Sequence, residues 1–211
     1  MKKIWLVLLG LFWVVNVTAS EFINGQHYIT LNKPIPVEAQ IVEFFSFYCP
    51  HCYQFEQIWP IGYIVNKNLP YPVKIIKYHI GCFGGNMGYA LTRAWTIAMV
   101  MGLENKVTLP IFHGILHDKT VTDEVSLKKV FMKVSGIKSA EYDVAWNSDQ
   151  VEYLVHKQEK IAEYVGLKGV PTMLIHGKYM INNSELDSRS TEVYLKQYSN
   201  LVRFLLTKKN Q

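Results

Sequence analysis

The sequence has few cysteines: Cys49, Cys52 and Cys82 are the only three among 211 residues. Three cysteines are too few for a fold that is held together by disulfides. With a histidine they could supply the four ligands of a structural zinc site, but no second Cys-x-x-Cys pair is present, so we do not favour one. We therefore expect no metal ion, and nothing in the sequence indicates another cofactor.

The sequence also lacks a basic cluster, an internal repeat and a low-complexity linker. Its formal net charge is +5, and this charge falls to +3 without Lys2 and Lys3. A small positive charge that is not clustered gives no indication of nucleic-acid binding. We therefore expect no nucleic acid among the partners.

Long hydrophobic runs are absent except at the N-terminus. Two lysines precede an apolar run over residues 4–15, and small residues follow as far as Ala19 and Ser20. This order is typical of a secretory signal peptide, and the run is shorter than the roughly 20 residues that span a membrane. We predict that residues 1–19 form a signal peptide, cleaved after Ala19 or Ser20, and that the mature protein is exported.

The most informative stretch is Cys49-Pro50-His51-Cys52, which follows an apolar strand and begins a helix. Two cysteines three residues apart at a helix start lie on one face, close enough to form a disulfide. Pro50 suits the first helical position. Free backbone N–H groups and the helix dipole converge on Cys49, so we expect a lowered thiol pKa there. Cys52, one turn further on, lacks this advantage.

His51 lies between the two cysteines and, protonated or as a hydrogen-bond donor, adds to the stabilisation of the Cys49 thiolate. A static structural disulfide is the alternative, but so short a loop would remove little chain entropy. We therefore favour redox chemistry at this pair. The isolated histidines at 79, 113 and 117 are expected to be structural or surface residues.

The hydrophobic pattern predicts elements in the order β-β-α-β, a helical block, and then β-β-α. The first part has strands over residues 28–31, 41–47 and 73–80, and a helix from Cys49 to Trp59 that breaks at Pro60. The helical block has helices over residues 89–101, 109–116 and 125–134, and a longer one from 148 or 149 to about 165. The last part has a hairpin over residues 172–175 and 179–181, and a helix that begins near Ser190.

This order indicates one α/β domain that is interrupted by an all-helical insertion, because a β-α-β unit is followed much later by a hairpin and a helix. The two strands of the β-α-β unit should be parallel. We assign residues 20–81 and 158–211 to the α/β domain and residues 82–157 to the insertion.

Several motifs together resemble the DsbA family of bacterial periplasmic thiol:disulfide oxidoreductases, whose fold is the thioredoxin fold with a helical insertion. The resemblance covers nearly all of the mature chain. Its motifs are Glu43-Phe44-Phe45-Ser46-Phe47, Cys49-Pro50-His51-Cys52-Tyr53-Gln54-Phe55-Glu56, Lys77-Tyr78-His79, Ala145-Trp146-Asn147-Ser148 and Gly169-Val170-Pro171. A lone Cys-x-x-Cys would be a weak signal, whereas this set is specific.

The resemblance implies roles for the residues that match it. Cys49 would be the reactive cysteine and Cys52 its buried partner, while Pro50 and His51 would be the dipeptide that sets the redox potential. Pro171 would be a cis-proline that faces the disulfide, with Val170 before it. The Val170 backbone would then offer hydrogen bonds to an extended substrate segment.

Glu43 and Lys77 match the charged pair that the family has beneath its active site. A glutamate inside an apolar strand is costly unless it is paired, and a lysine on the adjacent strand is a natural partner. Two roles remain open for this pair: a structural ion pair, or proton transfer to and from Cys52.

An apolar groove is expected beside the reactive cysteine. Tyr53, Phe83 and Met173 are candidates to line it, although ordinary core packing would explain each of them as well. Cys82 departs from the family pattern, which has phenylalanine there. We expect Cys82 to be a buried free cysteine that packs as a small hydrophobic residue.

The function that these features favour is that of a dithiol oxidase, which donates its disulfide to reduced exported proteins through a mixed disulfide at Cys49. A disulfide isomerase or reductant of the same fold and a peptide-binding chaperone are the alternatives. Isomerases of this fold are dimers with an added N-terminal domain, and residues 21–36 are too few to form one, so we expect a monomer. The resemblance also implies a periplasmic location and reoxidation by a DsbB-like, quinone-linked membrane protein.

Overall fold

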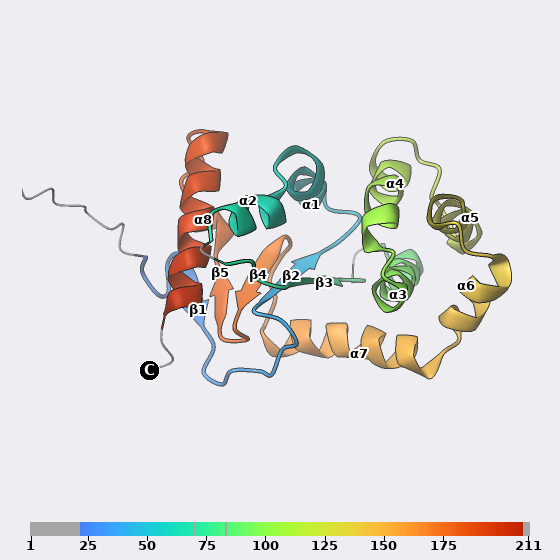
Figure 1. The fold of residues 1–211 in the computed structure, drawn as a ribbon, viewed down its shortest axis with the longest axis horizontal. Helices are drawn as coiled ribbons and strands as arrows, with labels where there is room; N and C mark the ends of the chain where they lie inside the picture. The colour runs from blue at the N-terminus through green and yellow to red at the C-terminus, as the bar shows by residue number, and fades with distance from the viewer. Residues whose placement is uncertain (1–21, 70, 83, 209–211) are drawn as a thin grey trace, which may run out of the picture.

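The structure is a computed structural model, and it describes residues 22–69, 71–82 and 84–208. A sheet with helices packed on both of its faces forms one half of the molecule, and a bundle of helices forms the other half (Figure 1). The predicted signal peptide, residues 1–19, lies outside the described residues. None of the helices in the described part of the chain is long and apolar enough to cross a membrane.

The sheet has five strands in the order β1-β5-β4-β2-β3. The strands are β1 (Tyr28–Thr30), β2 (Ile41–Phe45), β3 (Ile75–His79), β4 (Thr172–Ile175) and β5 (Tyr179–Ile181). β2 and β3 are parallel, whereas β2–β4, β4–β5 and β1–β5 are antiparallel. The predicted parallel unit, the later hairpin and the α/β class with a helical insertion are thereby confirmed.

The central strand β2 is buried along its whole length, as its nearly continuous apolar sequence predicts. Ile41 packs on one side of the sheet with Leu201 of α8 (Thr191–Thr207). Val42 and Phe44 pack on the other side with Ala162 of α7 (Asp149–Tyr164). The alternation of side chains along a strand therefore places a helix on each face.

The helix that carries the two cysteines is irregular. α1 (Pro50–Tyr53) runs into a π-helical turn over Gln54–Ile58, and the chain breaks at Trp59 and Pro60 before α2 (Ile61–Lys67). The break at the proline was predicted, because proline cannot continue a helix. The π-helical turn was not predicted, since no local sequence signal marks it.

The insertion contains α3 (Asn86–Met101), α4 (Glu104–Leu116), α5 (Glu124–Ser135) and α6 (Ser139–Trp146), and α7 leads back to the sheet. The predicted start of α4 at residue 109 is wrong, because Pro110 lies inside the helix and buried Val107 favours an earlier start. α6 was missed, since Tyr142 is its one buried residue and leaves no hydrophobic pattern to detect.

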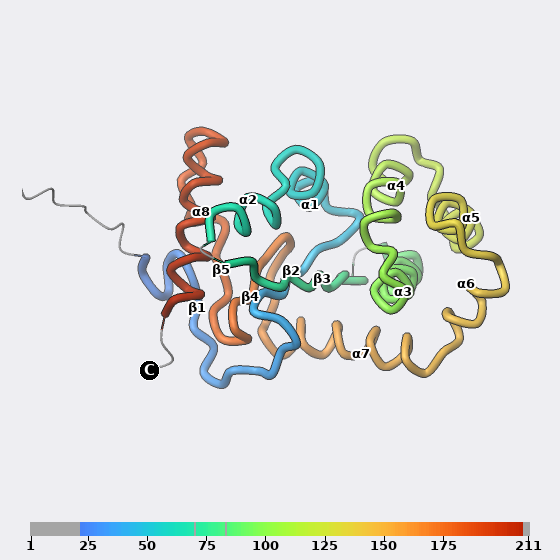
Figure 2. Tube along the Cα trace, in the orientation of Figure 1, coloured from blue at the N-terminus to red at the C-terminus, as the bar shows by residue number. Residues whose placement is uncertain are grey.

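The path of the chain shows why the insertion belongs to the same fold. After β3 the chain leaves the sheet half, passes through the helical bundle and returns along α7 (Figure 2). Near the start of α7, Val151 packs in the core of the bundle, whereas Ala162 and Val165 pack against the sheet. This packing agrees with a boundary within α7, and the boundary at residues 157 and 158 remains a prediction.

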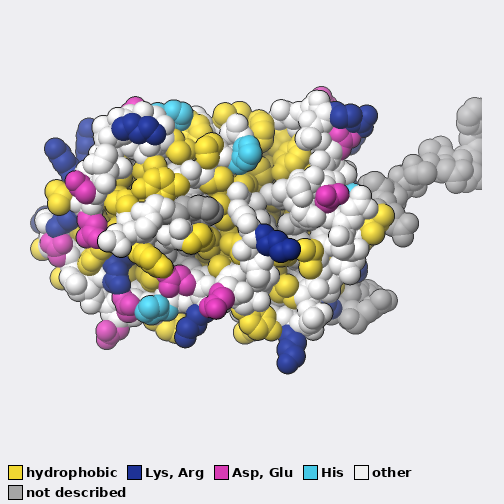
Figure 3. All heavy atoms as spheres, turned by 180° about the vertical axis from the view of Figure 1, so that it is seen from behind, with side chains coloured by type: hydrophobic (Ala, Val, Ile, Leu, Met, Phe, Trp, Pro, Cys, Tyr) yellow, Lys and Arg dark blue, Asp and Glu magenta, His cyan; other side chains and the backbone are white. Residues whose placement is uncertain are grey.

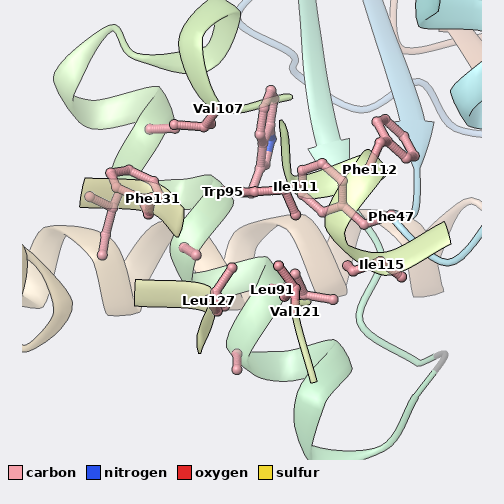
Figure 4. Packing of buried hydrophobic residues seen from close by; sticks show 14 of the residues in the cluster. Phe47, Leu91, Trp95, Val107, Ile111, Phe112, Ile115, Val121, Leu127 and Phe131 are labelled. Atoms are coloured by element: carbon pink, nitrogen blue, oxygen red, sulfur yellow. The ribbon is translucent and has the colours of Figure 1, made fainter. Parts of the chain in front are cut away.

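The segment between β2 and α1 packs into the core of the insertion. Phe47 lies beside Phe112 of α4, with ring centroids 4.8 Å apart, and near Trp95 of α3 (Figure 4). These side chains are buried. The insertion therefore packs directly against the chain that leads to Cys49.

Candidate active site

Cys49 occupies the position just before the first residue of α1. Its backbone is extended, with φ −95° and ψ 113°, and Pro50 is the first helical residue. Proline has no N–H group to leave unbonded and its φ angle suits a helix, so the helix begins here. The Cys49 sulfur accepts a hydrogen bond from the Cys52 N–H group at 3.3 Å and caps the helix.

The two sulfurs have different surroundings. Cys49 is half-buried and Cys52 is buried, and neither forms a disulfide, so the structure shows the dithiol form. The Cys52 thiol, the N–H groups of Cys52 and His51, and the charge of His51 lower the pKa of Cys49 to about 6, against the opposing effect of burial. Burial raises the pKa of Cys52, and the neighbouring Cys49 sulfur adds to the rise. At neutral pH, Cys49 is therefore a thiolate and Cys52 a thiol.

The loop before β4 forms the wall that faces Cys49. The Val170–Pro171 peptide bond is cis, as the resemblance implied. The Cys49 sulfur lies 3.3 Å from the Val170 carbonyl oxygen and donates a hydrogen bond to it when it is a thiol. Folding thus brings the predicted cysteine and the predicted proline loop together.

A groove of about 650 Å³ lies beside this loop. Its lining includes exposed His51 from α1, buried Phe55, and Val170 and Pro171, and it also includes Trp59 and Tyr194. Trp59 and Tyr194 were not predicted to line a groove, because residues 135 positions apart meet only in the folded chain. The large aromatic side chain at each position was the one sequence feature that could have indicated such a role. Seen from behind, hydrophobic side chains cover much of the middle of the molecule and most charged side chains lie toward its outline (Figure 3).

A charged group with three members lies on β2, β3 and the π-helical turn after α1. Glu43 and Lys77 face each other in the β2–β3 register, and Lys77 Nζ lies 3.4 Å from Glu43 Oε2. Neither oxygen of Glu43 accepts a hydrogen bond from the described residues, so this contact is electrostatic. Lys77 donates its hydrogen bond to Glu56 instead. Glu56 was missed, although its place one helical turn after Cys52 was a signal.

The predicted groove residues need correction. Met173 does not line the groove, since it is fully buried in the core between the sheet and α8. Its position opposite Glu43 in the β4–β2 register places it in the sheet interior. Phe83 lies outside the described residues. Tyr53 is half-buried, but it packs against the insertion and not in the groove.

Tyr53 meets the two histidines of α4. Its hydroxyl lies 3.5 Å from His113 Nε2, and its ring centroid lies 5.0 Å from that of His117. His113 is half-buried and His117 is exposed. They connect α1 to the insertion.

Cys82 is exposed, so the prediction of a buried cysteine is wrong. It follows β3, and Gly84 and Gly85 beyond it have positive φ angles of 86° and 57°. No cluster of three or more metal-ligating side chains that could hold an ion occurs among residues 22–69, 71–82 and 84–208.

The sequence matches a known family over residues 40–193, and that family is described as DSBA-like thioredoxin domain. The chain is 46% identical over 209 residues to the thiol:disulfide interchange protein DsbA of Escherichia coli K12. The aligned region covers 99% of this chain and 100% of that protein. DsbA of Salmonella typhimurium LT2 matches with the same identity and coverage.

Solved structures agree with this match. A cysteine-to-serine variant of Proteus mirabilis DsbA, with a non-covalently bound peptide PWATCDS, has a TM-score of 0.81 and 38% identity, over 90% of this chain and 100% of that chain. SrgA of Salmonella enterica serovar Typhimurium has a TM-score of 0.80 and 33% identity, over 86% of this chain and 99% of that chain. Sequence and structure thus match whole proteins of one kind, and the chain belongs to the DsbA family of thiol:disulfide oxidoreductases.

Proposed function

We propose that the protein is a dithiol oxidase, which donates a disulfide between Cys49 and Cys52 to reduced proteins exported to the periplasm. The difference between the two sulfurs is the observation that supports this direction. A stabilised Cys49 thiolate favours the reduced enzyme, so the oxidised enzyme gives its disulfide away readily. A reductant would need the opposite preference.

The reaction proceeds through two exchanges. A substrate thiolate attacks the Cys49 sulfur, the Cys49–Cys52 bond breaks, and Cys52 leaves and takes up a proton. A second substrate thiolate attacks the substrate sulfur of this mixed disulfide, and Cys49 leaves as a thiolate. The substrate loses two electrons and gains a disulfide, while the enzyme gains two electrons and becomes the dithiol.

The surroundings of each sulfur suit its part in these two exchanges. Cys49 is accessible to an attacking thiolate, and the helix start stabilises it as the final leaving group. Cys52 is buried, and the negative charge of Glu43 contributes to its raised pKa, so it holds a proton once it is released. In this proposal Glu43 and Lys77 pass that proton to and from Cys52, in addition to forming an ion pair.

The substrate lies along the Val170–Pro171 loop in this proposal. An extended segment would pair with the Val170 backbone by β-addition, and the adjoining groove would hold its side chains. The exposed Pro50 and His51 border the approach to Cys49. The Proteus mirabilis relative was solved with a non-covalently bound peptide, which supports a peptide-binding role for this chain.

The remaining parts of the proposal come from the resemblance and the N-terminal sequence. Residues 1–19 are a cleaved signal peptide, and the mature chain is a periplasmic monomer. A DsbB-like, quinone-linked membrane protein takes the two electrons from the dithiol and restores the disulfide. This partner closes the catalytic cycle.

Oxidation of a reduced model substrate tests the proposal. Wild type, taken as the disulfide form, and Cys82→Ser should oxidise the substrate at equal rates, whereas Cys49→Ser should be inactive. Cys52→Ser has no disulfide to donate, but treatment with oxidised glutathione should convert it to a mixed disulfide that mass spectrometry locates at Cys49, with reduced glutathione released. Equal rates for Cys49→Ser and wild type would refute the redox function and leave the chaperone alternative. A glutathione equilibrium that favours the oxidised enzyme would instead indicate a reductant.

The titration of Cys49 provides a second test. Thiolate absorbance and alkylation rate of the reduced protein should rise with pH around a midpoint of about 6, because the thiolate is the reactive form. Mass spectrometry should locate the fast alkylation at Cys49 and not at the exposed Cys82. A midpoint above 8 would remove the basis for an oxidising enzyme.

A further inference from the structure

His79, at the end of β3, is a fully buried histidine outside the groove and outside the charged group. Its Nε2 atom accepts a hydrogen bond from the Phe47 N–H group at 3.1 Å. Its Nδ1 atom lies 2.8 Å from Thr92 Oγ1. Since Nε2 is an acceptor, the proton is on Nδ1, which donates to Thr92. Thr92 in turn donates to the Gly88 carbonyl at 3.1 Å, so the chain of donors runs in one direction.

The neutral imidazole is the form that fits this site. Protonation would put a second N–H group on Nε2, facing the Phe47 N–H group, and two donors would then oppose each other. Burial also lowers the pKa of His79, to about 3. The imidazole therefore remains a fixed acceptor for Phe47 at any pH at which the enzyme works.

The atoms around His79 are hydrogen-bonded to side chains of two helices, α7 and α3. The His79 N–H group donates to Gln158 Oε1 of α7 at 3.0 Å. Gln158 Nε2 donates to Thr96 Oγ1 of α3 at 2.8 Å, and Thr96 donates to the Thr92 carbonyl at the same distance. These side chains are all buried. A closed polar network thus joins β3, α3 and α7.

The Phe47 N–H group belongs to the turn that delivers Cys49 to the helix start. The turn closes with a hydrogen bond from the Cys49 N–H group to the Ser46 carbonyl at 3.0 Å. Phe47 is its second residue, and its ring stacks on His79 with centroids 5.1 Å apart. Its N–H group is hydrogen-bonded to a side chain of β3. His79 is therefore placed to set the orientation of this turn.

We propose that His79 is a positioning residue, through which the insertion helix α3 holds the 46–49 turn and so keeps the Cys49 sulfur in place at the helix start. The contact between the Cys49 sulfur and the Cys52 N–H group depends on that placement. His79 touches neither cysteine among its hydrogen-bond and ring contacts, so it acts through Phe47. The proposal rests on the proposed role of Cys49 as the reactive thiol.

The first test compares two substitutions at the same position. His79→Phe keeps a ring in the core but removes the acceptor, so the Phe47 N–H group loses its partner and the turn can shift. The Cys49 titration midpoint should rise by about one unit, and the glutathione equilibrium should move about tenfold toward the oxidised enzyme. His79→Gln can restore an acceptor near the place of Nε2, and its shift should be less than about threefold.

The second test uses two matched threonines on α3. Thr92→Val removes the acceptor of the His79 Nδ1–H group and should move the glutathione equilibrium by about threefold, in the same direction. Thr96→Val removes a hydroxyl from the same buried network without touching His79, and the equilibrium should not move. Both variants lose a buried hydroxyl on one helix, so a general loss of stability would affect them alike.

The outcomes separate the proposal from its alternatives. If His79→Phe lowers stability but leaves the Cys49 midpoint and the glutathione equilibrium unchanged, His79 is a core residue only and the proposal is wrong. If His79→Phe does not fold, the same result for Thr92→Val leads to the same conclusion. Equal shifts for Thr92→Val and Thr96→Val would also overturn it. If alkylation of the wild type shows no low-pKa thiol at Cys49, the proposed function fails first and this proposal fails with it.

Discussion

Lys77 and His79 lie two residues apart on β3, and their surroundings are opposite in kind. Lys77 faces Glu43 and His79 faces Phe45 across the same pair of strands. Around Lys77 the groups are charged, and the two oxygens of Glu43 accept no hydrogen bond within the described part of the chain. Around His79 the group is neutral, and its backbone N–H group and both ring nitrogens have partners.

The difference shows how one strand serves two purposes. A buried polar network in which every member is bonded loses free energy with any displacement, so it holds one geometry. A buried charge with incomplete hydrogen bonding is costly, and a change in protonation relieves the cost. Position 79 therefore suits the holding of the turn before Cys49, whereas the pair of Glu43 and Lys77 suits a change of protonation, as the proposed proton transfer to Cys52 requires.

The largest effect is expected at His79, where a fall in pH should lower the free energy of unfolding. The folded-state pKa of His79 is about 3, below the ordinary value near 6.5, so between these values the unfolded chain binds a proton that the folded chain does not. Its contribution to stability is therefore complete above pH 6.5 and is lost as the pH falls toward 3. The loss should reach about 3 kcal/mol at pH 4, at about 1.4 kcal/mol per pH unit.

Urea unfolding at pH 7 and pH 4 measures this effect in wild type and in His79→Gln. The carboxylates titrate in both proteins, so the difference between them isolates position 79. The variant should lose about 3 kcal/mol less than wild type over this range. Equal losses would mean that His79 is already protonated in the fold, and the comparison of the two sites would fail.

A smaller effect is expected where the network meets α7. Gln158→Met keeps the length of the side chain but leaves the His79 N–H group without an acceptor in the core, which should lower the free energy of unfolding by about 2 kcal/mol. Gln150→Met, an exposed position on the same helix, should change it by less than about 0.5 kcal/mol. Chemical unfolding measures both, and a Gln158→Met variant as stable as Gln150→Met would show that the network contributes little.

The elements around Cys49 could be predicted from the sequence because their signals are local. The apolar run of β2 and the sequence Cys49-Pro50 specify a buried strand followed by a helix start, and both are confirmed. The hairpin after Ile175 is equally local: Gly177 has a φ of 63°, and a Cβ atom there would collide with the Ile35 carbonyl oxygen. α6 has no such local signal, and it was missed.

The contacts that complete the site could not be predicted, since they join distant parts of the chain. His79 bonds to Phe47, 32 positions away, and to Gln158, 79 positions away. A single histidine in a strand gives no indication of either partner. The burial of Met173 and the exposure of Cys82 also depend on packing that no local pattern encodes.

The smallest effect, and the one of opposite sign, is expected at the charged site. Glu43→Gln removes a buried charge whose oxygens accept no hydrogen bond from the described residues. Lys77 keeps its bond to Glu56, and its side chain is about a quarter exposed. No charge is left unpaired, so the substitution should raise the free energy of unfolding by about 1 kcal/mol. Glu56→Gln removes the bonded partner of Lys77 and should lower the free energy of unfolding slightly.

Thermal and urea unfolding of the two variants measure the signs of these changes in free energy. The dependence of Cys52 alkylation on pH should change only in Glu43→Gln. A destabilised Glu43→Gln with an unchanged Cys52 profile would make Glu43 a structural ion-pair member, and the pair of Glu43 and Lys77 would then serve stability alone.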